Sequence, residues 1–297
     1  MQPNPVLKRL GLTDTDRVAV IHLDDVGMFQ SSLSAYQELM DFGLVASAAV
    51  MVPCPWFPAT AAYLREHPDL DMGVHITLTS EWNAFRWGPI STRDAATGMM
   101  DDEGYFYRSE EDARASGSAG AVKTEIHAQI KTALTAGIRP THIDSHMGTV
   151  FHHKFLSHYA EAAQQHHLAA FIMRATSADM EEDGLDKDTI SVADSLIKRL
   201  EAEKYPLVDY FEGMPLERAF DFKERLDVAK EKFAALKPGI THFILHAAHD
   251  TPELRASAYD WQARVGDLQV FLSEDLRQFI KSQGIHVVGY RALQQTI

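Results

Sequence analysis

The stretch Arg17-Val-Ala-Val-Ile-His-Leu-Asp-Asp-Val-Gly27 decides how this chain folds. Its apolar, β-branched run at residues 18–23 is bounded by turn signals, which predicts a buried central strand. Two adjacent carboxylates, Asp24 and Asp25, follow the run at once, at the end of the strand where parallel sheets carry their chemistry. Because like charges repel, the pair indicates a bound cation or two catalytic carboxylates, with a turn or helix-cap role as the structural alternative.

Composition excludes several functional classes. The 297 residues suffice for one large α/β domain, and 28 basic against 42 acidic residues give a net charge of −14. This charge disfavours nucleic acid and anionic membranes as partners. The single Cys54 excludes an internal disulfide and a cysteine-based metal cluster. We find no signal-like N-terminal segment and no apolar stretch of bilayer length, so we expect a cytoplasmic protein without a membrane span.

The chain alternates apolar, strand-like runs with helical segments, which predicts a parallel sheet. The strands are expected at residues 18–23, 45–52, 72–79, 141–146, 168–174, 207–211, 239–246 and 285–290, and one late helix at 267–283. With no linker to divide it, the chain is expected to form one α/β domain, residues 1–297, folded as a (β/α) barrel. An open doubly wound sheet is the alternative. Residues 80–120 form an aromatic-rich insertion that suits a lid or binding loop, or a surface excursion.

Titratable side chains gather where the expected strands end. These are Asp24, Asp25, His75, Asp144, His146, Arg174 and His246. Two imidazoles and one carboxylate form a common catalytic metal set, and a bound Zn²⁺ lowers the pKa of its water to roughly 7. A neighbouring carboxylate can then act as general base, and a histidine across the site can protonate the leaving group. Any one of these histidines alone is more often structural than a ligand.

Three motifs carry a resemblance to a known family. They are Asp24-Asp25-x-Gly, Gly73-Val74-His75-x-Thr-Leu-Thr and Pro140-Thr-His-Ile-Asp-Ser-His146. Together they resemble the leading motifs of the YdjC-like carbohydrate deacetylases, which include deacetylases of chitooligosaccharides and of hopanoid biosynthesis. Further residues fall in the family's order, namely Arg174, His246, the segment from Arg255 to Arg264, and Tyr290-Arg291. The resemblance spans nearly the whole chain. It implies a polysaccharide-deacetylase-like fold, a distorted, TIM-like (β/α) barrel.

The resemblance also implies a function for each matching residue. Asp25, His75 and His146 match the ligands of one divalent metal ion, for which we expect Zn²⁺, with Mg²⁺ as the alternative. Asp24 matches the general base, and His246 the histidine that assists the leaving group.

The implied reaction removes an N-acetyl group from a small, chitooligosaccharide-like amino sugar by attack of metal-activated water. We assign Asp144 and Arg174 to a supporting role, in which they hold the histidine ligands and the Asp24 carboxylate in place. The resemblance further favours a homodimer.

The chain departs from the family pattern at three places. His22-Leu23 replaces the usual Asn-Ala, residues 147–150 replace a histidine-rich run, and His246-Ala247-Ala248 replaces a His-Pro-Gly type motif. The expected metal ligands survive all three changes, whereas residues on the substrate side do not. Two alternatives therefore stay open: another metal-assisted amide or ester hydrolase on the same barrel, and a non-catalytic sugar- or metal-binding protein. The presence of Asp24 favours an enzyme, because a pure metal site needs no second carboxylate there.

Overall fold

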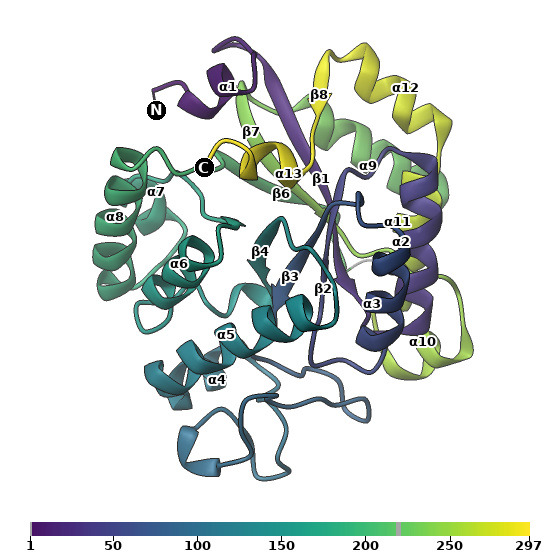
Figure 1. Cartoon of the computed structure of the whole chain (residues 1–297). Helices are drawn as coiled ribbons and strands as arrows, with labels where there is room; N and C mark the ends of the chain where they lie inside the picture. The colour runs from purple at the N-terminus through teal and green to yellow at the C-terminus, as the bar shows by residue number, and fades with distance from the viewer. Residues whose placement is uncertain (1, 218–220) are drawn as a thin grey trace.

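A curled parallel sheet forms the centre of the molecule, and helices flank it (Figure 1). The computed structural model describes residues 2–217 and 221–297. Within these residues the sheet has eight strands, in the order β5-β4-β3-β2-β1-β7-β6, with β8 paired to β1. The strands are β1 (Arg17–Val26), β2 (Ser47–Val50), β3 (Met72–Ile76), β4 (His142–Ser145), β5 (Ala169–Ala170), β6 (Tyr210–Gly213), β7 (Gly239–Leu245) and β8 (Ile285–Val287).

Strand β1 is the centre of the sheet, as its apolar sequence predicts. Residues Arg17 to Leu23 pair with β7 along one edge. On the other edge β8 pairs with the first three residues of β1, and β2 pairs with its later part. The outer strands β5 and β6 approach each other only through an isolated parallel bridge between Met173 and Val208. The sheet is thus a half-barrel that is nearly closed, and the predicted distorted (β/α) barrel is confirmed.

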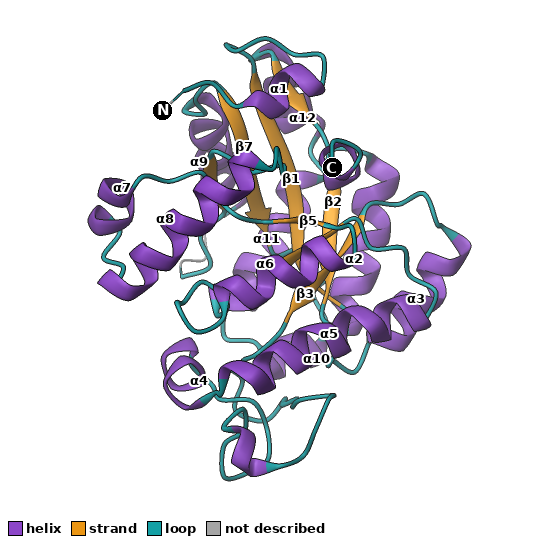
Figure 2. Cartoon of the chain, turned by 60° about the vertical axis from the view of Figure 1, so that its left-hand side comes forward, coloured by secondary structure: helices purple, strands orange, loops and turns teal. Residues whose placement is uncertain are grey.

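Most helices lie on the outer side of the sheet, whereas α1 and α13 pack against inner-face residues such as Val18 (Figure 2). They are α1 (Pro5–Arg9), α2 (Gln30–Phe42), α3 (Phe57–Glu66), α4 (Glu110–Ser116), α5 (Ala119–Thr135), α6 (Leu156–Gln165), α7 (Ser177–Glu182), α8 (Lys187–Ala202), α9 (Phe222–Ala234), α10 (Pro252–Ser257), α11 (Trp261–Phe271), α12 (Glu274–Ser282) and α13 (Tyr290–Gln294). The prediction of one helix at 267–283 is wrong, because Ser273 adopts an extended backbone and begins a separate helix, α12. Among the described helices, none combines the length and apolar character needed to cross a bilayer.

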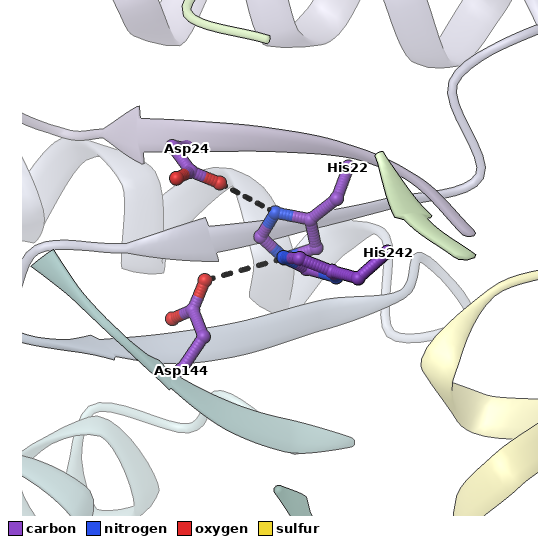
Figure 3. Close-up of side chains that lie close together, drawn as sticks. All are labelled: His22, Asp24, Asp144 and His242. Atoms are coloured by element: carbon purple, nitrogen blue, oxygen red, sulfur yellow. Dashed lines mark hydrogen bonds and ion pairs between the residues drawn. The ribbon is translucent and has the colours of Figure 1, made fainter. Parts of the chain in front are cut away.

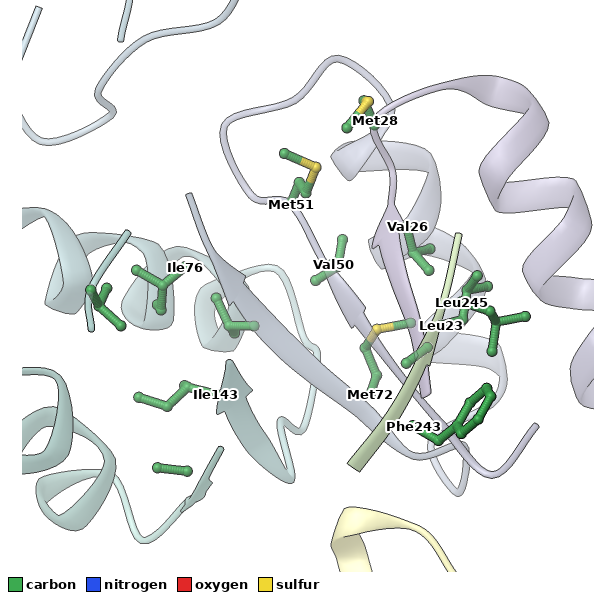
Figure 4. Close-up of a cluster of buried hydrophobic side chains, with 14 of the residues drawn as sticks. Leu23, Val26, Met28, Val50, Met51, Met72, Ile76, Ile143, Phe243 and Leu245 are labelled. Carbon is green, nitrogen blue, oxygen red and sulfur yellow. The ribbon is translucent and has the colours of Figure 1, made fainter. Parts of the chain in front are cut away.

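Strand alternation divides the core into two parts. Side chains on the outer face, such as Leu23, Val50 and Phe243, pack in a large apolar cluster beneath the helices (Figure 4). Side chains on the inner face, such as Val18 and Ile240, form a smaller cluster inside the half-barrel. Successive residues of a strand point to opposite faces. The inner positions therefore recur every second residue, and toward the C-terminal ends of the strands they become histidine and aspartate.

Part of the aromatic insertion packs against the protein. Trp82, Trp87 and Phe106 are buried. The Trp87 indole donates to the carbonyl of Thr79 at 2.7 Å. The segment lies beyond the C-terminal ends of the central strands, at the lower end of the molecule in Figure 1. Its buried aromatics therefore form part of the wall at this end of the sheet.

The close approach of β3 and β4 gives a test of this packing. A Cβ atom at Gly73 would lie 2.4 Å from Nε2 of His142. We therefore expect Gly73→Ala to reduce the free energy of unfolding by about 1–3 kcal/mol, the usual cost of overpacking a core. Gly120→Ala is the matched control, because no atom lies within 4 Å of its added methyl group. Equal stability of the two variants in urea denaturation would contradict this packing.

Candidate active site

The two carboxylates at the end of β1 reach the same buried region, although a regular strand would direct them to opposite faces. Asp25 has a φ of 63°, in the left-handed region, which aspartate adopts more readily than most residues. The pairing between β1 and β2 also shifts between Leu23 and Val26. Asp24 and Asp25 are both buried. This local break in the strand places two negative charges side by side inside the protein.

Asp25 lies among three cationic or metal-ligating groups. Its Oδ1 is 3.1 Å from Nδ1 of His146 and 3.4 Å from Nε2 of His75. Its Oδ2 accepts a hydrogen bond from Nη1 of Arg264 at 2.8 Å. Ligand atoms of Asp25, His75 and His146 all lie within 4.8 Å of one another. One carboxylate and two imidazoles are a donor set that suits zinc, so this cluster could hold a divalent ion.

Neighbouring carboxylates orient the two histidines of this cluster. Nδ1 of His75 donates to Oδ1 of Asp144 at 2.7 Å, which leaves Nε2 directed toward Asp25. This carboxylate–histidine pair is typical of metal sites, where it fixes the ring and raises its basicity. Nε2 of His146 lies 3.0 Å from Glu81.

The charges around the cluster shift the pKa values of its members. Burial alone would raise the pKa of Asp25, but His146 and Arg264 hold it well below its usual range. Burial alone would lower the pKa of His146, but the Glu81 and Asp25 carboxylates raise it to about 9. Burial is likewise outweighed at His75, where Asp144 and Asp24 raise the pKa well above its ordinary value. In the metal-free protein both imidazoles are therefore protonated at neutral pH.

Asp24 has a separate set of partners. Its Oδ1 accepts a hydrogen bond from Nδ1 of His22 at 2.7 Å, and its Oδ2 lies 3.7 Å from Nε2 of His246. Burial would raise the pKa of Asp24, but the bond from His22 and the nearby imidazoles lower it, so the carboxylate is ionised at neutral pH. Figure 3 shows His22 between Asp24 and Asp144, with His242 beside it.

A chain of hydrogen bonds leads from Asp24 through the half-barrel. Nε2 of His22 lies 2.8 Å from Nε2 of His142, and Nδ1 of His142 lies 2.9 Å from the hydroxyl of Thr141. That hydroxyl donates to Asp71, which also accepts from the hydroxyl of Ser47 and the backbone amide of Arg291. The chain thus joins Asp24 to a carboxylate at the N-terminal side of the sheet.

The number of hydrogens in this chain determines the charge of His22. Thr141 has one hydroxyl hydrogen and gives it to Asp71, so its oxygen accepts from Nδ1–H of His142. Burial and the neighbouring His22 lower the pKa of His142 well below its usual value, so this ring is neutral and accepts at Nε2. His22 must then donate from both nitrogens, to His142 and to Asp24. We infer that His22 is an imidazolium paired with the Asp24 carboxylate.

The structure brings together most of the residues predicted from the sequence, with one exception. Asp24, Asp25, His75, Asp144, His146 and His246 all line one cavity. Arg174 does not, since its guanidinium bonds Asp209, Glu201 and the backbone carbonyl of Gln2. The prediction that Arg174 supports the site is therefore wrong, because the chain leaves β5 after two residues and turns toward Val208. Arg264 is the guanidinium that contacts the cluster.

Sequence reasoning missed several residues of the site. His22 and His142 lie two positions before Asp24 and Asp144 on their strands, so the period of two was a usable signal for their inward orientation. Glu81 comes from a loop that no pattern in the sequence indicates. Arg264 comes from α11, and its only sequence signal is the place of residues 255–264 in the family's order. Two further groups have metal-ligand spacing. His22, Asp24, Asp144 and His242 are buried beside the first cluster, whereas His152, His153 and Asp186 lie at the partly exposed surface.

The cavity above this site has a volume of about 710 Å³. Near Asp25 its wall includes Glu81, Trp82, Tyr259 and Arg264. The opposite part extends past β5 and β6 to α7 and α8. A cavity of this size can hold a ligand much larger than one acetyl group.

Comparisons with known proteins agree with this architecture. The family model described as "YdjC-like protein" matches residues 18–282. A carbohydrate deacetylase of Thermus thermophilus is 30% identical over 292 residues, which cover 98% of this chain and 99% of that protein. A carbohydrate deacetylase of Thermoanaerobacter pseudethanolicus is 24% identical, over 93% of this chain and 98% of that protein. Both alignments span nearly the full length of each chain.

Among solved structures, an Enterococcus faecalis protein described as a cellobiose-phosphate cleavage protein superposes with a TM-score of 0.75. The superposition covers 94% of this chain and 99% of that one, at 21% sequence identity. At this identity the match supports the fold.

The raised histidine pKa values predict how the cluster takes up a metal. Because a ligating imidazole must lose its proton, binding of Zn²⁺ at pH 7 should release about two protons, from His75 and His146. The apparent affinity should rise as the pH increases toward 9. Calorimetric titrations in buffers of different ionisation enthalpy measure the released protons. Binding of Zn²⁺ without proton release, or a zinc affinity that is constant between pH 7 and 9, would contradict His75 and His146 as protonated groups that become ligands.

The hydrogen-bond chain gives a second prediction. Thr141→Val removes the acceptor of Nδ1 of His142, so His142 should move its hydrogen to Nε2 and His22 should lose one proton. ¹⁵N NMR of the imidazoles should show both nitrogens of His22 protonated in the wild type and only one in the variant. Thr241→Val is the matched control, because the Thr241 hydroxyl is buried and has no hydrogen-bond partner. Two protonated nitrogens of His22 in both variants would refute the inferred chain.

Proposed function

The chain belongs to the YdjC-like protein family, and from that membership we propose that it is a metal-dependent hydrolase that removes an N-acetyl group from a small amino sugar. The observation that carries this proposal is that the two adjacent buried carboxylates have different partners. Asp25 faces two imidazoles and a guanidinium, whereas Asp24 faces His22 and His246. The names of the Thermus and Thermoanaerobacter relatives support the same reaction.

The cluster of Asp25, His75 and His146 would hold the metal ion. We propose Zn²⁺, because two imidazoles and one carboxylate are a common zinc set, with Mg²⁺ as the alternative. A divalent ion bound there would polarise the amide carbonyl and lower the pKa of its bound water. Asp144 fixes the ring of His75 from behind. Arg264 bonds the other oxygen of Asp25 and so keeps this carboxylate in one orientation.

Asp24 is the proposed general base. Its carboxylate is ionised at neutral pH and can accept a proton at Oδ2 from the attacking water, because Oδ1 is already bonded to His22. His246 follows the neighbouring strand β7, approaches the same Oδ2 and is placed to protonate the departing amine. Hydrolysis then yields acetate and the free amino sugar. From the family resemblance we also propose that the protein acts as a homodimer.

Acetate release from N,N′-diacetylchitobiose, with and without added Zn²⁺ or Mg²⁺, tests this proposal. We expect Asp24→Asn to lower kcat by about 10²–10⁴-fold, the usual contribution of a general base, while the metal content stays unchanged. Asp25→Ala should lose both metal and activity. Asp221→Asn is the matched control, since Asp221 is an exposed helix cap where asparagine serves equally well.

Two results would contradict the proposed roles. Unchanged turnover in Asp24→Asn would exclude Asp24 as the general base. Full metal content in Asp25→Ala would show that the metal binds outside the cluster of Asp25, His75 and His146.

A further inference from the structure

The cavity has two chemically different arms that meet at the carboxylate pair. The polar arm contains Glu81, Trp82, Tyr259, Asp260 and Arg264. The apolar arm contains Phe171, Met180, Leu185, Ala193, Leu196 and Ile197. Side chains of the first arm follow β3 or lie at the start of α11, whereas those of the second come from β5, α7, α8 and the segments beside them. The two arms therefore belong to different sectors of the barrel.

The apolar arm exists because the sheet barely closes between β5 and β6. An isolated bridge, Met173 to Val208, joins the segment after β5 to the segment before β6, and α7 and α8 cover the region from outside. Figure 1 shows these two helices together on the side of the molecule away from α2 and α3. Met180, Ala193, Leu196 and Ile197 are all buried, yet they line the cavity. The arm is thus an apolar chamber continuous with the proposed catalytic site.

The polar groups beside this chamber are already bonded or turned to solvent. Arg114 donates to the carbonyls of Gly148 and Thr149. The Thr189 hydroxyl donates to Asp186. Asp183 is exposed. A sugar ring placed here would bury hydroxyl groups without partners, which is costly. The chamber therefore suits a hydrocarbon group and disfavours a sugar.

The hydrolysed amide has two substituents, and the two arms match them. The carbonyl carbon must lie beside Asp24 and the Asp25 cluster, where the arms meet. The amino sugar then suits the polar arm. Glu81 uses Oε2 for His146 and Asp260 uses Oδ1 for Arg264, so the second oxygen of each carboxylate can accept from a hydroxyl, and Trp82 and Tyr259 can stack on a ring. The acyl chain is left for the chamber of α7 and α8. An acetyl group would reach little of it.

We propose that the site hydrolyses not only N-acetyl groups but, with preference, N-acyl chains of an amino sugar that are several carbons longer than acetyl, and that Ala193, Leu196 and Ile197 select this chain. This inference rests on the proposed function and extends its substrate class. The reaction is balanced with water alone: the amide C–N bond breaks, a C–O bond forms from water, and the products are a free carboxylic acid and the amine. Each methylene buried in the chamber should favour the substrate by about fourfold.

A series of methyl N-acylglucosaminides carrying acetyl, butanoyl and hexanoyl groups tests the proposal. For the wild type with its metal, kcat/KM should rise about fourfold per added methylene. Ala193→Phe fills the chamber from α8 and should abolish this rise. Ala202→Phe is the matched control, because Ala202 is exposed at the end of the same helix. Leu185→Phe narrows the chamber from another segment and should act in the same direction as Ala193→Phe, in case that variant does not fold.

The other outcomes each have a clear meaning. Hydrolysis of the acetyl compound with no gain along the series would overturn the acyl chamber and leave the deacetylase proposal intact. A gain for octyl N-acetylglucosaminide instead, with a flat acyl series, would overturn the acyl assignment and place the aglycone in the chamber. No hydrolysis of any amide by the metal-loaded enzyme would overturn the proposed function and this inference with it.

Discussion

The burial of two adjacent carboxylates at the end of β1 is the constraint on which the rest of the site depends. Two ionised groups this close repel each other, and burial makes each one costly unless it is paired. The structure surrounds them with His75, His146 and Arg264 on one side, and with His22 and His246 on the other. Side chains from several separate elements therefore compensate this buried charge.

The left-handed backbone at Asp25 makes the two carboxylates different from each other. A continuous strand would place Asp25 among the apolar side chains beneath the helices, whereas the observed turn brings it to the inner site. Asp24 keeps the regular inner position and its bond to His22. One local break in a strand thus yields a carboxylate suited to hold an ion and a second one suited to move a proton.

The sequence predicts the barrel well, because apolar β-branched runs and strand periodicity depend on local residues. The inner-face positions of Asp24, His75 and Asp144 follow from the same periodicity. Arg174 was assigned wrongly because β5 ends after Ala170, and no local pattern shows where the chain turns next. Arg264 and Glu81 reach the site from a distant helix and a long loop, so only tertiary packing reveals their contacts with Asp25 and His146. The boundary between α11 and α12 was missed since both segments have helical composition.

The most direct test of the central claim is anomalous X-ray scattering from crystals of the zinc-loaded protein, measured on both sides of the zinc edge. The account predicts one strong peak between Asp25, His75 and His146, at about 2.0–2.2 Å from their ligand atoms. A peak confined to the surface group of His152, His153 and Asp186, or no peak beside Asp25, would contradict it.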